Sequence, residues 1–525
     1  MENDNDSAVN GELGGNGSGE DGRVRRLVVV SNRLPIVLKH DPGGGWKAEP
    51  GQGGLVTALA PVLRDRGGLW VGWPGTVEDA ADEAVRDAAK QGGVGYDLEC
   101  VTLTGEELEN YYHGFSNEIL WPLFHDLPDR CNFEPAYWPV YRQVNHKFAE
   151  TIARTTREED YVWIQDYHLL LAAEQLRLSG VERRLGFFLH IPFPPPDTFM
   201  KLPWRFQVLE AMLEYDLLGF QTARDLRNFI QCVRALIAGA RVQANRRMAA
   251  SITTRQGREL RLGAFPIGID YKKFSDLAQS QHVAEQAWYI HEALPERKLI
   301  FGVDRLDYTK GIPQRILALS DLLERYPEHR GQLTFIQVVV PSRTEVPEYQ
   351  QLRRRVEQLV GQVNGRFTTS GWTPIHYIAR PLALRELIAY YRTAEIGLIT
   401  PLKDGMNLVA KEYCACSLDE GVLILSEFAG AAAQLHSGAL LANPFDIQGL
   451  ADRIHAALTM EQDERLARMR RLRRCIARQN VFWWVDSFLR AAIAQDLGSF
   501  PQVEYFVPRP PEPSDAEASL TSSGL

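Results

Sequence analysis

A turn at Asp404 and Gly405 combines the features of an anion-binding site with a carboxylate. The apolar run at 396–399, bounded by turn-forming residues, predicts a buried parallel strand, and a helix is expected from Met406. The free N–H groups and the positive dipole end of such a helix suit a phosphate. A carboxylate beside a phosphate is repelled unless it faces other groups, and sugar hydroxyls would serve. The turn therefore suits a sugar nucleotide, with helix capping by Asp404 as the alternative.

Two cations in the same half of the chain could hold the phosphates of such a ligand. Arg305 and Lys310 lie five residues apart around another expected strand-to-helix turn, after the apolar run 298–304. No acidic pair with metal-ligand spacing accompanies them in the sequence. We therefore expect side chains rather than Mg²⁺ to neutralise a diphosphate, and we predict no metal and no other cofactor.

Polar residues also stand at the ends of apolar runs in the first half. Arg33, Asp166 and His190 each end a run that is typical of a buried strand. Open α/β sheets bind ligands at the carboxyl ends of their strands, so the three residues are expected to share one cleft, although a lone histidine is more often structural. The stretch 111–125 is unusually aromatic, which usually indicates core, but aromatic rings also suit the faces of a sugar.

The elements that must position these residues alternate between strand-length apolar runs and helical periods. Such alternation predicts an α/β fold with doubly wound parallel sheets. The alternation pauses near 260–270 and starts afresh at 298, so we expect two Rossmann-like domains that face a deep cleft. The expected division is a disordered tail (1–22), a first domain (23–268), a second domain (269–480), a helix that packs back on the first domain (481–500) and a second disordered tail (501–525).

Composition narrows the class of protein. The chain has 525 residues, 45% hydrophobic and 24% charged, as expected for a soluble globular protein of two or three domains. A net charge of −9 argues against non-specific nucleic-acid binding. Six scattered cysteines, of which only Cys414 and Cys416 lie close, predict free thiols in a reducing compartment and no zinc site. No signal-peptide pattern and no apolar run of about 18 residues is present, so we expect a cytoplasmic protein without a membrane partner.

A series of ordered motifs, spread from about residue 26 to about residue 486, resembles the trehalose-6-phosphate synthase family of retaining GT-B glycosyltransferases. The motifs are SNR, GGL, YYxxFSNxxLWPxFH, DYHLL, GFFLHIPFP, DLLGFQT, VDRLDYTKGIPQR, VPSRTEV, TPLKDGMNLVAKEY and LSEFAGAA. One departure is Gln165, where many relatives have histidine. It is adjacent to the residues that the resemblance assigns to the ligands, not among them.

The resemblance implies transfer of glucose from a nucleotide-glucose, expected to be UDP-glucose, to glucose 6-phosphate, and it assigns residues to each substrate. The donor-binding residues would be Gly54, His190, Arg305, Lys310, Asp404, Gly405, Met406, Asn407, Leu408, Val409 and Glu412. The acceptor-binding residues would be Arg33, Tyr112, Trp121, Asp166, Gln221 and Arg343. The catalytic residues would be Asp166, His190, Arg305 and Lys310. Within these sets Asp404 would bind the glucose hydroxyls, Glu412 the ribose, and Arg343 the acceptor phosphate from the opposite domain.

The family joins the two sugars 1,1 with retention at the donor carbon, which is usually explained by front-side attack. The sequence suits that mechanism because no carboxylate pair of glycosidase type is evident. Two alternatives stay open. A sister enzyme would use another phosphorylated acceptor, such as glycerol 3-phosphate, and a non-catalytic sensor would be expected to lack some donor residues. The base of the donor (uridine, adenosine or guanosine) and the oligomeric state, including a homo-oligomer, are not indicated by the sequence.

Overall fold

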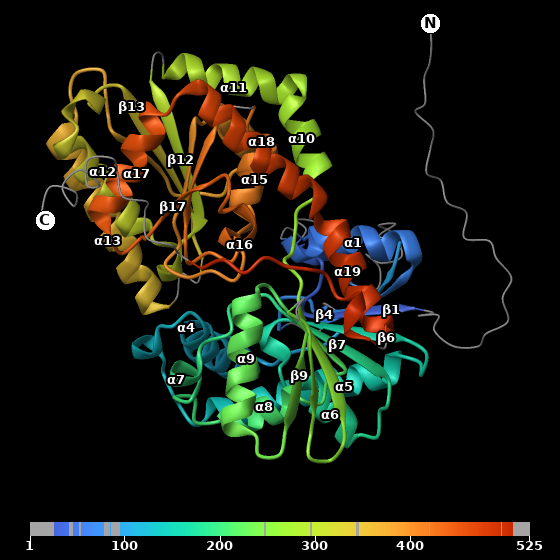
Figure 1. Ribbon diagram of the computed structural model, residues 1–525. Coiled ribbons are helices and arrows are strands. Elements are labelled where there is room, and N and C mark those ends of the chain that lie inside the picture. Colours follow the sequence, from blue (N-terminus) through green and yellow to red (C-terminus); the bar gives the residue numbers. More distant parts are fainter. Residues whose placement is uncertain are drawn as a thin grey trace, which may run out of the picture.

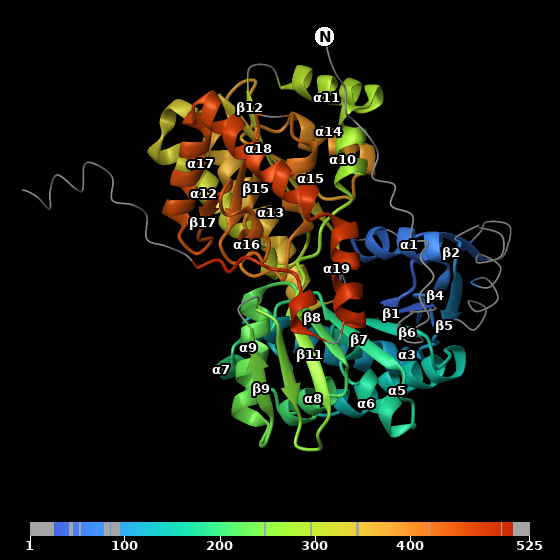
Figure 2. The ribbon, with the colours of Figure 1, turned by 45° about the vertical axis from the view of Figure 1, so that its right-hand side comes forward.

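The computed structural model describes residues 26–40, 46–51, 54–77, 85, 95–245, 248–294, 297–342, 346–418, 420–494 and 496–507. Two lobes, each built around one twisted sheet, are visible in Figures 1 and 2. Arg343 and the N-terminal tail lie outside the described residues. Residues 501–507 contain neither helix nor strand, and the remainder of the predicted C-terminal tail is likewise outside the described part.

The first sheet has nine strands in the order β5-β4-β1-β6-β7-β8-β11-β10-β9. Its strands are β1 (Leu27–Arg33), β4 (Gly68–Trp73), β5 (Asp97–Cys100), β6 (Tyr161–Gln165), β7 (Arg184–Leu189), β8 (Leu217–Phe220), β9 (Arg241–Ala244), β10 (Ala250–Thr253) and β11 (Glu259–Ala264). Interior strand β1 pairs in parallel with both neighbours, so that Val29 lies opposite Trp70 on one side and Trp163 on the other. The carboxyl ends of β1, β6 and β7 therefore reach the same edge.

The sheet differs from the parallel prediction at one edge, where β10 is antiparallel to both β9 and β11. Only short loops join these three strands, and a parallel connection needs a crossover of a dozen or more residues. A separate antiparallel hairpin is formed by β2 (Ile36–His40) and β3 (Trp46–Pro50).

Helices surround this sheet. They are α1 (Gly54–Arg66), α3 (Gly105–Glu107), α4 (Trp121–Phe124), α5 (Tyr137–Thr155), α6 (Ala172–Leu178), α7 (Pro196–Phe199), α8 (Arg205–Met212), α9 (Ala223–Leu236) and the single turns η2 (Pro128–Arg130) and η3 (Tyr167–Leu169). The aromatic stretch of the sequence forms a π-helix, η1 (Leu108–Leu120), which a capping box between Thr104 and Glu107 precedes. Such helices are rare and are often found at functional sites.

The second sheet is wholly parallel, in the order β14-β13-β12-β15-β16-β17. Its strands are β12 (Lys298–Arg305), β13 (Leu333–Val340), β14 (Ile375–Ile378), β15 (Ile396–Ile399), β16 (Val422–Ser426) and β17 (Leu440–Ala442). Its helices are α10 (Tyr271–Gln279), α11 (Gln281–Ala293), α12 (Ile312–Arg325), α13 (Pro347–Phe367), α14 (Leu384–Thr393), α15 (Leu408–Cys416), α16 (Ala432–Leu435), α17 (Ile447–Thr459), α18 (Gln462–Arg478) and the turns η4 (Tyr308–Lys310) and η5 (Pro327–His329). Strand β12 lies at the centre, which places Arg305 at the ligand edge.

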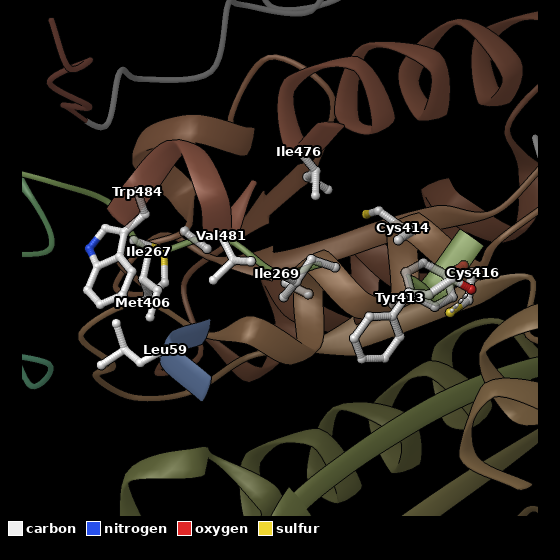
Figure 3. Close-up of a cluster of buried hydrophobic side chains, with 14 of the residues drawn as sticks. Leu59, Ile267, Ile269, Met406, Tyr413, Cys414, Cys416, Ile476, Val481 and Trp484 are labelled. Carbon is white, nitrogen blue, oxygen red and sulfur yellow. Dashed lines mark hydrogen bonds between the residues drawn. The ribbon is translucent and has the colours of Figure 1, made fainter. Parts of the chain in front are cut away.

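Two crossings of the chain between the lobes, near residues 268 and 480, lie side by side. The N–H of Val481 donates to the carbonyl of Ile269, and a Cβ on Gly268 would lie 2.4 Å from the carbonyl oxygen of Gln479. Beyond this point α19 (Val481–Ile493) packs on the first sheet, with Phe488 stacked on Trp163 at 4.2 Å. Side chains from both lobes meet around the crossings in one apolar cluster (Figure 3). These contacts support the proposed division near residues 268 and 480.

Two further expectations concern the cysteines and membrane-spanning helices. All six cysteines are free, as the sequence predicts. Within the described ranges no helix is long and apolar enough to cross a membrane.

Candidate active site

A cavity of about 460 Å³ opens at the carboxyl ends of β1 and β6 and extends to the end of β12. It brings together five of the predicted residues, namely Arg33, Tyr112, Trp121, Asp166 and Arg305. Other lining residues include Asn32, Gln165, Tyr167 and His168. Cationic, aromatic and hydroxyl-binding groups thus meet in one space, as expected for a phosphorylated sugar.

Asp166 occupies a sharp bend between β6 and η3. Its backbone φ is 73°, a value that is uncommon for residues other than glycine, so the bend at Asp166 carries local strain. The backbone N–H of His190 donates to Oδ1 at 3.2 Å. Burial raises the pKa of Asp166 to about 7, although N–H donors from Tyr167, His190 and Ile191 oppose the shift.

His190 lies behind the cavity wall between two glutamines. Its Nε2 is 3.0 Å from Oε1 of Gln165, and its Nδ1 is 3.4 Å from Nε2 of Gln221. Burial lowers the pKa of His190 to about 3, so the ring is neutral at pH 7. Gln221 is only 2% exposed, and its contacts are with His190 and Ile267 rather than with the cavity. The substrate contacts predicted for these two residues stay predictions.

Lys310 and Asp404 meet where two turns of the second domain converge. Lys310 Nζ lies 2.7 Å from Oδ2 of Asp404, which also accepts a hydrogen bond from Asn407 at 3.1 Å. Burial acts to raise the pKa of Asp404, but Lys310, His125 and Asn407 outweigh it, so the pKa lies below the ordinary value.

The helix after this turn corrects two expectations. Helix α15 begins at Leu408 rather than Met406, and Asn407 is its N-cap, because the Asn407 side chain accepts from the N–H of Ala410 at 3.0 Å. Capping by Asp404 was therefore wrong. The Met406 side chain is buried in the apolar cluster of Figure 3, so only its backbone faces the turn.

The first-domain segment after η1 meets these turns across the cleft. The Arg305 guanidinium lies 6.0 Å from the centre of the Trp121 ring, and that of Arg130 lies 4.8 Å from the ring of Tyr308. Lys403 and Asp126 form an ion pair between the domains. Gly405 is required where the domains touch, because a Cβ there would lie 2.2 Å from the carbonyl oxygen of His190.

Two histidines at this site were assigned no ligand contact from the sequence. The Nδ1–H group of His125 donates to the carbonyl of Trp121 at 2.7 Å, and burial lowers the pKa of His125 to about 4. His168 stacks on Tyr112 with ring centres 5.7 Å apart. Both histidines lie inside the sequence motifs quoted above, but only the fold shows that they lie at this site.

A second cavity of about 380 Å³ adjoins the first, and Gly51 lines both. Leu408 and Glu412 of α15 line this cavity, and Val409 is packed at the edge of the neighbouring core. Tyr391 donates to Oε2 of Glu412 at 3.1 Å, and burial raises the pKa of Glu412 to about 7. Gly54 begins α1 near this point. Arg343 lies outside the described residues, so its role stays a prediction.

The chain is similar to known proteins over most of its length. The model of glycosyltransferase family 20 matches residues 25–494. A trehalose-6-phosphate synthase of Mycobacterium sp. (strain KMS) is 42% identical over 483 residues, which are 90% of this chain and 96% of the relative. The chain is also similar to two solved structures. One is the UDP-forming alpha,alpha-trehalose-phosphate synthase of Burkholderia xenovorans in complex with glucose-6-phosphate, with 37% identity, a TM-score of 0.79 and coverage of 89% of this chain and 100% of that chain.

The other solved structure is trehalose-6-phosphate from E. coli bound with UDP-2-fluoro glucose, with 38% identity, a TM-score of 0.80 and coverage of 90% of this chain and 99% of that chain. The family model and these relatives span both domains and both cavities. The chain belongs to glycosyltransferase family 20.

Proposed function

We propose that the chain is a retaining glucosyltransferase that moves glucose from UDP-glucose to glucose 6-phosphate and forms alpha,alpha-trehalose 6-phosphate and UDP. The observation that carries the proposal is the pair of adjoining cavities, which share Gly51 and open on the ligand edges of both sheets. The bound ligands named for the Burkholderia and E. coli structures are one acceptor and one donor analogue of this reaction.

The donor would lie along the second domain. Glu412 lines the second cavity and has one carboxyl oxygen bonded to Tyr391, which leaves acceptor capacity for the ribose hydroxyls. The N-terminus of α15 at Leu408 and the cations Arg305 and Lys310 would hold the diphosphate. Asp404 would receive the glucose hydroxyls, and its low pKa keeps it an acceptor at neutral pH.

The acceptor would occupy the larger cavity in the first domain. Tyr112 and Trp121 offer aromatic surfaces to the sugar ring, and Asp166 offers a carboxyl group to its hydroxyls. Arg33 stands at the cavity with its guanidinium 4.3 Å from the centre of the Trp73 ring, so it is pre-oriented for a phosphate. Arg343 is proposed to reach the same phosphate from the second domain, on the basis of the family motif alone.

The reaction would then proceed by positioning and by charge stabilisation. The bond between C1 of glucose and the diphosphate oxygen breaks, and C1 forms a bond to O1 of the acceptor on the same face. The acceptor proton moves to the departing phosphate oxygen, whose negative charge Arg305 and Lys310 stabilise. Asp404 is ion-paired with Lys310, which favours a binding role over attack on C1.

A matrix of donors and acceptors tests the proposal. Release of nucleoside diphosphate is measured for uridine, adenosine and guanosine diphosphate glucose, each with glucose 6-phosphate, fructose 6-phosphate and glycerol 3-phosphate. The highest turnover is expected for UDP-glucose with glucose 6-phosphate. Highest turnover with glycerol 3-phosphate would instead support the sister enzyme, and binding of both sugars without release would support a sensor. Free thiols and a nucleotide-sugar donor further support a cytoplasmic location.

A further inference from the structure

A series of hydrogen bonds, joined at one point through the backbone of Ile267, links the donor helix α15 to the wall of the acceptor cavity. It begins at Lys411, the neighbour of Glu412, whose Nζ donates to the carbonyl of Ile267 and to Oε1 of Gln434, each at 2.6 Å. Lys411 is 1% exposed, and Gln434 is bonded in turn to Gln479. Because Ile267 and Gln479 flank the two crossings between the domains, the chain starts at the point where the lobes join.

The hydrogen-bond series continues into the first domain, and the donor and the acceptor of each bond are defined. The N–H of Ile267 donates to Oε1 of Gln221 at 3.0 Å, which fixes the orientation of that amide. Nε2 of Gln221 must then be the donor toward Nδ1 of His190, at 3.4 Å. A neutral imidazole that accepts at Nδ1 carries its proton on Nε2, and this proton points to Oε1 of Gln165 at 3.0 Å.

The hydrogen-bond series ends at Gln165, on the wall of the acceptor cavity. With its oxygen engaged by His190, the amide nitrogen of Gln165 faces the carbonyl of Trp163 at 3.5 Å, so every link has a consistent donor and acceptor. Gln165 lines the acceptor cavity and precedes Asp166, whose Oδ1 accepts from the backbone N–H of His190. The burial that lowers the pKa of His190 favours the neutral ring that this arrangement needs.

We propose that Gln165, Gln221 and Lys411 are positioning residues, which hold His190 as the Nε2–H tautomer and set the Gln165–Asp166 wall according to how the two domains meet. The proposal rests on the proposed function for its effect on turnover, and it deepens that function by adding residues to which no substrate contact is assigned by this geometry. Because the hydrogen-bond series crosses the junction between the domains, loss of the bonds of Lys411 is expected to affect the same Gln165–Asp166 wall as loss of the bonds of Gln221. The two breaks should therefore not add.

A spectroscopic experiment tests which group donates and which accepts in these hydrogen bonds, and it needs no turnover. In ¹⁵N-histidine-labelled protein the His190 signal, identified by its loss in His190→Gln, is expected to carry its proton on Nε2. In Gln221→Glu the new carboxylate can only accept, so the proton is expected on Nδ1. A wild-type proton on Nδ1, or an unchanged tautomer in Gln221→Glu, would overturn the proposal. A protein that gives these signals but makes no product contradicts the proposed function alone.

A kinetic experiment tests the coupling. Gln221→Leu and Lys411→Met are each expected to lower kcat about tenfold, while the Kd for UDP changes by less than about threefold. The kcat of the double variant should be no lower than that of the more severely impaired single variant. Gln165→Leu should resemble them, whereas Gln165→Glu, which still accepts from Nε2–H, should recover most of kcat. Gln175→Leu is the matched control, because Gln175 is a buried glutamine of α6 bonded to Glu174. Losses that multiply in the double variant, or an equal loss in the control, would overturn the proposal.

Discussion

Lys310 Nζ and Asp404 Oδ2 lie 2.7 Å apart, although the two residues are separated by 94 positions in the sequence. The contact joins the turn after β12 to the turn after β15, at the N-terminal side of α15. In the proposed complex the diphosphate takes the free side of the lysine and the glucose hydroxyls take the free side of the aspartate. The pair therefore sets the distance between the group that leaves and the sugar that is transferred.

Removal of the cation should separate catalysis from folding. Lys310→Ala is expected to lower kcat about a hundredfold, because the diphosphate loses a charge-assisted contact as it departs. It should also lower the free energy of unfolding by about 3 kcal/mol, because the side chain of Asp404 is only 15% exposed and loses its partner. Adding Asp404→Asn should restore most of the stability but not the turnover, as measured by urea unfolding and UDP release.

The matched control for this prediction is Lys272→Ala, which removes a lysine from an ion pair with Asp276 on the exposed surface of α10. That variant should leave both turnover and unfolding unchanged. Near-normal turnover in Lys310→Ala would remove Lys310 from the proposed mechanism.

Glu412 predicts a pH dependence of donor binding. Its pKa is raised from 4.5 to about 7, so the carboxylate that accepts from ribose hydroxyls forms only as the pH rises through about 7. UDP affinity should therefore rise about threefold or more between pH 6 and pH 8 in the wild type relative to Glu412→Gln. The phosphates of UDP titrate equally with both proteins, so calorimetry on the pair isolates Glu412. Parallel pH curves would contradict the ribose contact.

The raised pKa of Glu412 also determines whether the free energy of unfolding rises or falls with pH. The folded protein keeps a proton on Glu412 that the unfolded chain releases at lower pH. The stability from this group is thus fully present below about pH 4.5 and is lost as the pH rises through about 7. Glu412→Gln should be more stable than the wild type at pH 8, and the difference should vanish near pH 4, as judged by urea unfolding at both values.

Asp166 should separate acceptor binding from donor binding. Asp166→Asn keeps a side chain that tolerates a positive φ, so the fold should persist while turnover with glucose 6-phosphate falls about tenfold or more. Asp166→Ala should additionally lower stability by about 1 kcal/mol or more, because alanine tolerates this φ poorly. The Kd for UDP should stay the same in both variants. An equal loss of UDP binding would place Asp166 outside the acceptor site.

Much of the second sheet could be predicted from the sequence, because buried parallel strands such as β12 and β13 appear as long apolar runs. Two of the strands that were not predicted, β9 and β14, lie at sheet edges. Strand β9 is mostly exposed and β14 is only partly buried, so neither shows the apolar run by which buried strands were found. The start of α15 was placed two residues early because Asn407 caps it through its side chain, a contact that apolar periodicity does not report.

The site could be predicted in part. Residues at strand ends were found because parallel strands bring their carboxyl ends to one edge, which is a rule of topology. Pairings between distant turns are not encoded in local spacing, so the contact of Lys310 with Asp404 needed the fold. Gln165 was interpreted as a neighbour of the ligand contacts, and its bond to His190 is revealed only by the fold.

Metal dependence offers an independent check on charge stabilisation. Arg305, Lys310 and the N-terminus of α15 supply positive charge where the diphosphate is proposed to lie. Turnover is therefore expected to persist in excess EDTA and to change by less than about twofold when Mg²⁺ is added. Loss of turnover in EDTA with recovery in Mg²⁺ would show that these groups do not suffice.

The most direct test of the account is the structure of the product. The purified chain is incubated with UDP-glucose labelled with ¹³C at C1 of glucose and with unlabelled glucose 6-phosphate, and the product is examined by ¹³C and ³¹P NMR. We expect a labelled anomeric carbon in the alpha configuration, joined to O1 of a glucose that still carries its 6-phosphate, with one UDP released per linkage. A beta-configured anomeric carbon would contradict retention, and UDP release without a 1,1-linked sugar phosphate would contradict the proposed acceptor.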